Sequence, residues 1–167
     1  MSRFQHLLLL GTLPLLVPMV VLLACLRWGC AGLASDYPED IQAAMPPFTR
    51  KEKVRGAILA GLFLLSLLAV VFFASWMWIH DDPSRGFLSA YGMALASMAV
   101  ACLLDILIVD WLIICLWRPN WVVIPDTEDC TGWGDYRFHV KAQFTPAALI
   151  ALFAIPAVLA GIATWIN

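Results

Sequence analysis

Two aspartates, Asp105 and Asp110, stand inside the long apolar run Phe87–Trp117. A helix rises about 1.5 Å per residue and a bilayer span needs roughly 20 residues, so both carboxyls fall within or close to the hydrocarbon region. An ionisable group at that depth is costly and marks either an ion or proton site or a polar contact between helices. These two acids are therefore the first candidates for chemistry in the chain.

The spacing of the two acids predicts separate surroundings for them. On a regular α-helix, residues five apart point about 140° apart, so one ion held by both Asp105 and Asp110 requires a break in the helix. Asp105 lies nearer the middle of the run, where burial penalises a charged carboxyl, and we expect it to be neutral. Asp110 lies nearer the end, where Arg118, Arg137 and His139 are its candidate partners at the membrane mouth.

A structural role is the alternative for both acids. A carboxyl inside a helix bundle can be satisfied by a hydroxyl such as that of Ser66 or Ser97, or by a basic residue at a helix end. The functional interpretation is a proton or cation relay, or a polar group in a substrate cavity. The sequence leaves both open.

The histidines offer weaker chemistry. His80 with Asp81 and Asp82 forms at most a weak surface metal site. His139, if its loop folds back toward Asp110, gives the one arrangement that resembles an enzyme site, as a metal ligand or an acid partner. No phosphate loop, nucleophile motif or HExxH pattern accompanies it. We therefore expect no cofactor and no resident metal, and the sequence favours a protein that is not an enzyme.

The elements that position these residues are apolar helices. The chain is 62% hydrophobic and 13% charged, whereas soluble domains are about 25% charged. Four runs of spanning length, at residues 6–26, 57–79, 87–117 and 144–166, predict an all-α integral membrane protein, a four-transmembrane-helix bundle forming one domain over residues 1–167. A net charge of −2 gives no basic face, which argues against a nucleic-acid partner.

The segment between the third and fourth runs carries a different pattern. Tyr136, Phe138 and Val140 alternate with polar residues at the period of a β-strand. This alternation predicts a short cytoplasmic β-hairpin between the last two helices.

Basic residues predict the orientation. Eight of the ten Lys and Arg residues lie in two loops: Arg27, Arg50, Lys51, Lys53, Arg55, Arg118, Arg137 and Lys141. The positive-inside rule places these loops in the cytoplasm and both termini outside, in a multi-pass protein of the cell membrane. A competing signal is Leu22–Cys25, which looks like a bacterial lipobox and would make Cys25 a lipidated first residue. Its apolar run is longer than the 7 to 15 residues of a signal h-region.

Small residues predict close helix contacts. Ala90 with Ala94, and Gly92 with Ala96, let another backbone approach the third run, and the fourth run has a matching stripe. That stripe consists of Ala147, Ala151, Ala154, Val158 and Gly161. The pattern fits a contact between these two helices within one chain and equally a contact between two copies of the chain.

The sequence allows three functions, of which it favours the first. The first is an accessory or assembly subunit that binds the bilayer and a protein partner or a second copy through these faces. The second is a proton- or cation-coupled transport component using Asp105 and Asp110. The third is a membrane metalloenzyme built on Asp110 and His139.

Overall fold

Four long apolar helices dominate the computed structural model, which describes residues 2–167. They run Arg3–Trp28, Arg50–His80, Phe87–Trp117 and Pro146–Trp165, and each is long and apolar enough to cross a membrane. Many large apolar side chains on them are exposed, among them Leu65, Leu116 and Phe153. Contiguous exposed apolar surface of this kind is unusual in water-soluble monomers, so the four helices are compatible with a multi-pass membrane protein.

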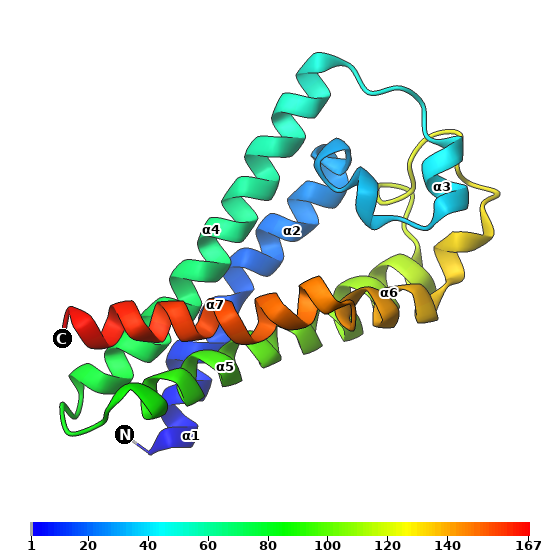
Figure 1. Ribbon diagram of the computed structural model, residues 1–167. Coiled ribbons are helices and arrows are strands. Elements are labelled where there is room, and N and C mark those ends of the chain that lie inside the picture. The colour runs from blue at the N-terminus through cyan, green and yellow to red at the C-terminus, as the bar shows by residue number, and fades with distance from the viewer. Residues whose placement is uncertain (1) are drawn as a thin grey trace. The chain divides into compact units, whose positions relative to one another are not determined.

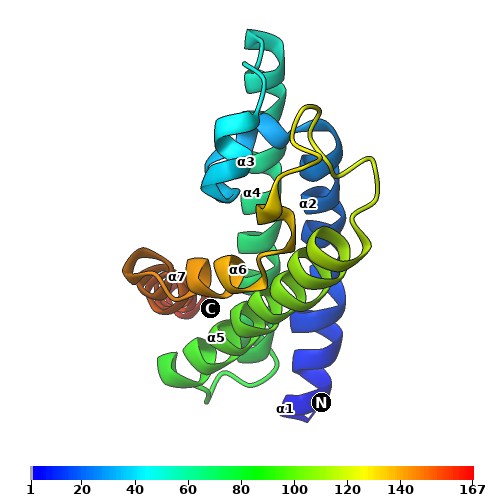
Figure 2. The same cartoon turned by 90° about the vertical axis from the view of Figure 1, so that its right-hand side faces the viewer.

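The elements follow in chain order (Figures 1 and 2). They are α1 (Arg3–His6), η1 (Leu7–Thr12), η2 (Leu13–Leu15), α2 (Leu16–Trp28), η3 (Cys30–Gly32), η4 (Ala34–Asp36), α3 (Glu39–Ala44), α4 (Arg50–His80), α5 (Phe87–Leu104), η5 (Asp105–Trp117), η6 (Thr131–Gly134), α6 (Tyr136–Gln143) and α7 (Pro146–Trp165). The η elements are π-helical in η1 and η5, and 3-10 helical elsewhere. The irregular stretch from Leu7 to Leu15 contains Pro14, which has no backbone N–H to donate.

The β-hairpin prediction is wrong, because the described residues 2–167 contain no strand. The segment with the alternating pattern is the helix α6. Asp135 Oδ1 accepts hydrogen bonds from the backbone N–H groups of Arg137 and Phe138, each at 3.0 Å. An aspartate that binds the N–H groups two and three residues on is a helix N-cap, and this local cap prevails over the period-two pattern.

The helices group into two compact units, described here one at a time. The first contains residues 2–18, 65–103 and 143–167. Its core includes Ile79, Ala90, Ala160 and Ala163, so small residues of α5 and α7 pack closely within one chain. The buried face of α7 is Pro156, Ala160 and Ala163. This is not the predicted stripe, of which Ala147, Ala154 and Val158 are exposed.

The second unit contains residues 19–64 and 104–142. Its core is built on Trp133 and Ile41, which are fully buried, with apolar residues of α2 and η5 around them. Figure 1 shows α3 next to the yellow segment that contains η6. At the start of α4, Thr49 and Glu52 form a capping box, with Thr49 N–H donating to Glu52 Oε2 at 2.8 Å and Glu52 N–H to Thr49 Oγ1 at 3.3 Å.

A glycine pair sets the closest backbone approach in the second unit. A Cβ on Gly56 of α4 would meet the backbone nitrogen of Gly32, and a Cβ on Gly32 would meet the carbonyl of Gly56. Because both obstacles are backbone atoms, neither can move aside cheaply. The contact therefore requires glycine on both sides.

We predict that Gly56→Ala destabilises the protein by about 1 to 3 kcal/mol, the usual cost of inserting a methyl into a packed contact. Gly61→Ala is the matched control on the same helix, since a Cβ there meets nothing within 4 Å. It should be neutral or raise stability by up to about 1 kcal/mol through helix propensity. Thermal unfolding in detergent measures both, and equal behaviour of the two variants would contradict the close approach.

Candidate functional site

One cavity in the second unit is lined by several polar and ionisable side chains. Its volume is about 160 Å³, enough for several water molecules since one needs only about 10 to 15 Å³. Its polar lining is Asp36, Tyr37, Asp105, Asp110 and His139, and its apolar lining is Leu22, Leu26, Leu33, Phe63, Val109 and Ile114. Three carboxyls and no Lys or Arg line it, so it suits a proton or a small cation.

Both predicted acids line this same cavity, which corrects the expectation of separate surroundings. The physical reason is the geometry of η5. Its hydrogen bonding is π-helical and ends with the N–H of Arg118 donating to the carbonyl of Ile113 at 2.8 Å. In i→i+5 geometry, residues five apart lie about one turn apart. Asp105 and Asp110 therefore lie near one face of the helix, where α-helical spacing would have spread them.

Asp110 and His139 form the central pair of the cavity. Asp110 Oδ1 lies 3.1 Å from His139 Nδ1, and their side chains are 14% and 8% exposed. With Asp110 ionised, this contact requires hydrogen on Nδ1, which leaves a lone pair on Nε2 of the neutral ring. Within the described part of the chain, His139 Nε2 is buried without a hydrogen-bond partner. The imidazole is thus oriented by a carboxylate at one nitrogen and able to take a proton at the other.

The helix α6 brings His139 to this position. His139 is the buried residue of α6, and the Asp135 cap described above fixes where the helix begins. The ring of Tyr136 contacts Trp111 of η5 edge to face, with centroids 5.8 Å apart. Local capping and one aromatic contact therefore position the imidazole against Asp110.

Tyr37 supplies a hydroxyl to the cavity. Its side chain is 3% exposed and its ring packs edge to face on Trp133 at 5.6 Å. Burial raises the pKa of the Tyr37 hydroxyl well above its ordinary value, with smaller contributions from nearby acidic groups. The hydroxyl therefore stays protonated at neutral pH, and among residues 2–167 it has no hydrogen-bond partner. It is a donor in the lining of the cavity.

Asp40 holds the segment that carries Tyr37. Asp40 Oδ2 accepts from the backbone N–H of Gly132 at 2.8 Å and from Thr131 Oγ1 at 3.2 Å, and Oδ1 accepts from the N–H of Ile41 at 2.9 Å. A Cβ on Gly132 would collide with the Asp40 carboxylate. The contact fastens α3 to η6, which keeps Tyr37 against Trp133.

The other predicted residues lie away from the cavity. Arg118, in a left-handed conformation with φ 44°, has its Nη2 3.5 Å from the carbonyl of Cys115, and Arg137 is exposed. Neither lines the cavity.

The weak candidate metal ligands His80, Asp81 and Asp82 each have a different partner. His80 stacks on Trp76 with ring centroids 5.4 Å apart, while Asp82 accepts from Ser84 and pairs with Arg85 at 3.3 Å. Asp81 lies 3.6 Å from the Nδ1 of His6. No group of three or more metal-ligating side chains occurs in residues 2–167.

Two lining residues, Asp36 and Tyr37, were not predicted. They belong to the polar stretch after the first apolar run, where the nearby Asp and Pro residues read as an ordinary surface turn. A buried tyrosine in such a stretch has no sequence signature of its own. Comparisons with protein families, with curated proteins and with solved structures found no match.

The Asp40 contact should respond to pH. The hydrogen bonds from the Gly132 N–H, then those from Ile41 and Thr131, lower the pKa of the Asp40 carboxyl below its ordinary value. A carboxyl with a depressed pKa stabilises the folded state above its unfolded pKa of about 3.9, and this stabilisation is lost as the pH falls through the folded value. We expect the Gly132 amide to be protected from hydrogen exchange at pH 6 and to lose protection below about pH 4.

Two variants separate Asp40 from the other acids. In Asp40→Asn the acid-dependent loss of Gly132 protection should disappear, whereas in Asp129→Asn, an exposed acid outside the contact, it should remain. An unchanged acid transition in Asp40→Asn would refute the role of this carboxylate.

Proposed function

We propose that the protein is a multi-pass membrane transport component that binds protons or small cations in the cavity of Asp105, Asp110 and His139. The observation that supports it most is the Asp110–His139 contact of 3.1 Å in a cavity that Asp105 also lines. An ionisable pair at this place in an apolar helix is costly unless it is used or fully satisfied. Here His139 Nε2 remains unpartnered among residues 2–167.

The chemistry of the lining favours a proton cycle. A proton taken up at His139 Nε2 turns the ring into an imidazolium, which the Asp110 carboxylate stabilises directly. Asp105 is a second acid on the same wall, and because it carries its proton at rest it can pass that proton to the relay and take one up again. The Tyr37 hydroxyl and water fill the space between these groups.

The two other functions fit the cavity less well. An accessory subunit that works only through its helix faces has no need of a cavity at Asp105 and Asp110, whereas both acids line one of about 160 Å³. A metalloenzyme needs at least three protein ligands at one point, and no such group occurs among residues 2–167. We therefore prefer transport to the accessory role and to the metalloenzyme.

The proposal includes the orientation and the assembly. The basic loops face the cytoplasm, so both termini lie outside. One chain of 167 residues has little internal volume for a solute path, so a complete path is formed with a partner or a second copy. Exposed small residues of α7 such as Ala147 and Ala154 are the faces available for that contact.

Proton flux tests the proposal. The pure protein in liposomes, with a pH-sensitive dye inside and an imposed pH gradient, should carry protons. Asp110→Asn should lower the flux at least tenfold because it removes the charge that stabilises the imidazolium, equivalent to about 1.4 kcal/mol. Asp105→Asn should lower it less, since an acid that is already neutral loses little when it becomes an amide.

Three further variants provide the controls. Asp129→Asn, an exposed acid outside the cavity, should leave the flux unchanged, and His139→Gln should resemble Asp110→Asn. If Asp110→Asn and Asp110→Leu both retain full flux and folding yield, Asp110 has no part in the function. Liposomes that conduct neither protons nor monovalent cations would return the accessory role to first place.

A further inference from the structure

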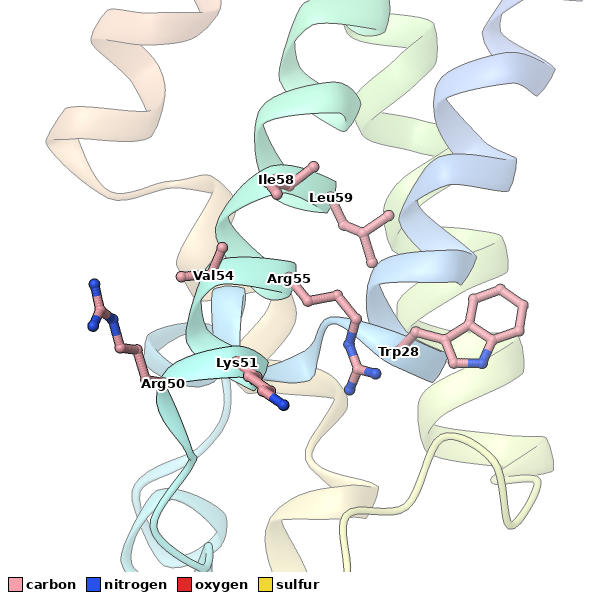
Figure 3. Close-up of a pocket in the computed structure, with 7 residues that line it drawn as sticks. All are labelled: Trp28, Arg50, Lys51, Val54, Arg55, Ile58 and Leu59. Carbon is pink, nitrogen blue, oxygen red and sulfur yellow. The ribbon is translucent and has the colours of Figure 1, made fainter.

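A groove beside the first turns of α4 forms a second site, apart from the cavity lining. It has a volume of about 580 Å³. Three of its lining residues are cationic and four are apolar: Arg50, Lys51 and Arg55, with Trp28, Val54, Ile58 and Leu59 (Figure 3). No acidic residue lines it.

The cations of the groove form no direct ion pair with any side chain that the structure describes. Arg50, Lys51 and Arg55 form no hydrogen bond or salt bridge through their side chains with any residue in the described range 2–167. The acid of this turn, Glu52, accepts from both the N–H and the hydroxyl of Thr49, at 2.8 and 2.7 Å. The capping box therefore occupies its carboxylate, and the positive end of the α4 dipole adds to the same field.

The apolar part of the groove is equally available. The side chains of Trp28, Val54 and Ile58 are 54%, 52% and 58% exposed. Figure 3 shows Arg55 reaching down between α4 and Trp28 with Lys51 beside it, while Arg50 extends to the opposite side. Cationic heads and an aliphatic wall thus lie next to each other.

This arrangement selects an amphiphile. From Lys51 to Leu59 the helix rises about 12 Å, which matches the passage from headgroups into the upper acyl chains at the end of a spanning helix. A soluble anion or an acidic peptide would satisfy the cations and leave Val54 and Ile58 unmatched. A zwitterionic lipid would cover the apolar side chains of the groove but would leave the positive charge of its cations unbalanced.

We infer that this groove binds an anionic phospholipid. Its phosphate lies between Lys51 and Arg55, an acyl chain follows Val54, Ile58 and Leu59, and Trp28 marks the interface. The inference stands apart from the transport proposal, because none of these residues lines the acidic cavity.

Native mass spectrometry of the full-length protein in detergent tests this. Phosphatidylglycerol should be retained at least tenfold more than phosphatidylcholine with identical chains. Each cation near an anionic lipid surface contributes about a fivefold change in binding. The double variant Lys51→Gln with Arg55→Gln should therefore bind phosphatidylglycerol about 25-fold more weakly and no longer prefer it to phosphatidylcholine. Arg55→Gln alone should bind phosphatidylglycerol about fivefold more weakly. This single variant keeps the test available if the double variant folds poorly.

Lys53→Gln is the matched control, with the same charge on the same helix and no place in the groove lining. It should retain the preference within about twofold, well under the fivefold of a lining cation. Ile58→Asn, at an exposed position, should weaken the binding of both lipids because it removes part of the apolar surface that contacts the acyl chain. Soluble glycerol phosphate should not displace the bound lipid.

Three results would overturn the site. Equal retention of the two lipids would show that the cations do not select a headgroup. An equal loss from Lys53→Gln and Arg55→Gln would show only a diffuse surface charge. Displacement by millimolar glycerol phosphate would show a soluble phosphate site without a role for the acyl chain.

Discussion

The Asp110–His139 pair is the contact on which the second unit depends. A carboxylate inside an apolar helix cannot remain alone, because the cost of burying its charge must be met by a partner or by water. The partner comes from α6, about thirty residues further along the chain, at 3.1 Å. Once α6 lies against η5, the loops on either side of it pack as one core around Trp133, and the cavity takes its shape from that packing.

The site combines features that oppose one another energetically. The carboxyls attract protons and cations, whereas the apolar walls formed by residues such as Leu22 and Val109 exclude bulk water. Charges in such surroundings interact more strongly than at a surface, because screening is weak. The Tyr37 hydroxyl stays neutral under these conditions and can donate to whichever group is charged. A small acidic cavity with largely apolar walls is therefore suited to binding and releasing a proton.

Much of the architecture could be predicted from the sequence, and particular residues show why. The apolar runs gave four helices because length and hydropathy alone decide such elements. The start of α4 is also set locally, because Thr49 and Glu52 form a capping box within four residues of sequence. Asp105 and Asp110 were recognised by their depth in the third run, a property of the sequence position itself.

The failures have local physical causes. The alternation of Tyr136, Phe138 and Val140 predicted a strand, whereas the Asp135 carboxylate caps a helix at this place. The common cavity of the two acids depends on π-helical hydrogen bonding in η5, which no sequence pattern announced. Tyr37 entered the site through the long-range contact between Asp40 and Gly132, which ninety-two positions separate. Such contacts follow from tertiary packing and cannot be predicted from the periodicity of the sequence.

The central claim is that Asp110 holds the His139 ring with Nδ1 protonated and Nε2 ready to accept a proton. Nitrogen-15 NMR of the histidine-labelled protein, with His139 assigned by comparison with His139→Gln, measures this directly. The account predicts an Nδ1–H resonance with an unprotonated Nε2 at neutral pH, and loss of this tautomer preference in Asp110→Asn. An Nε2–H tautomer at neutral pH that is unaffected by Asp110→Asn would contradict it.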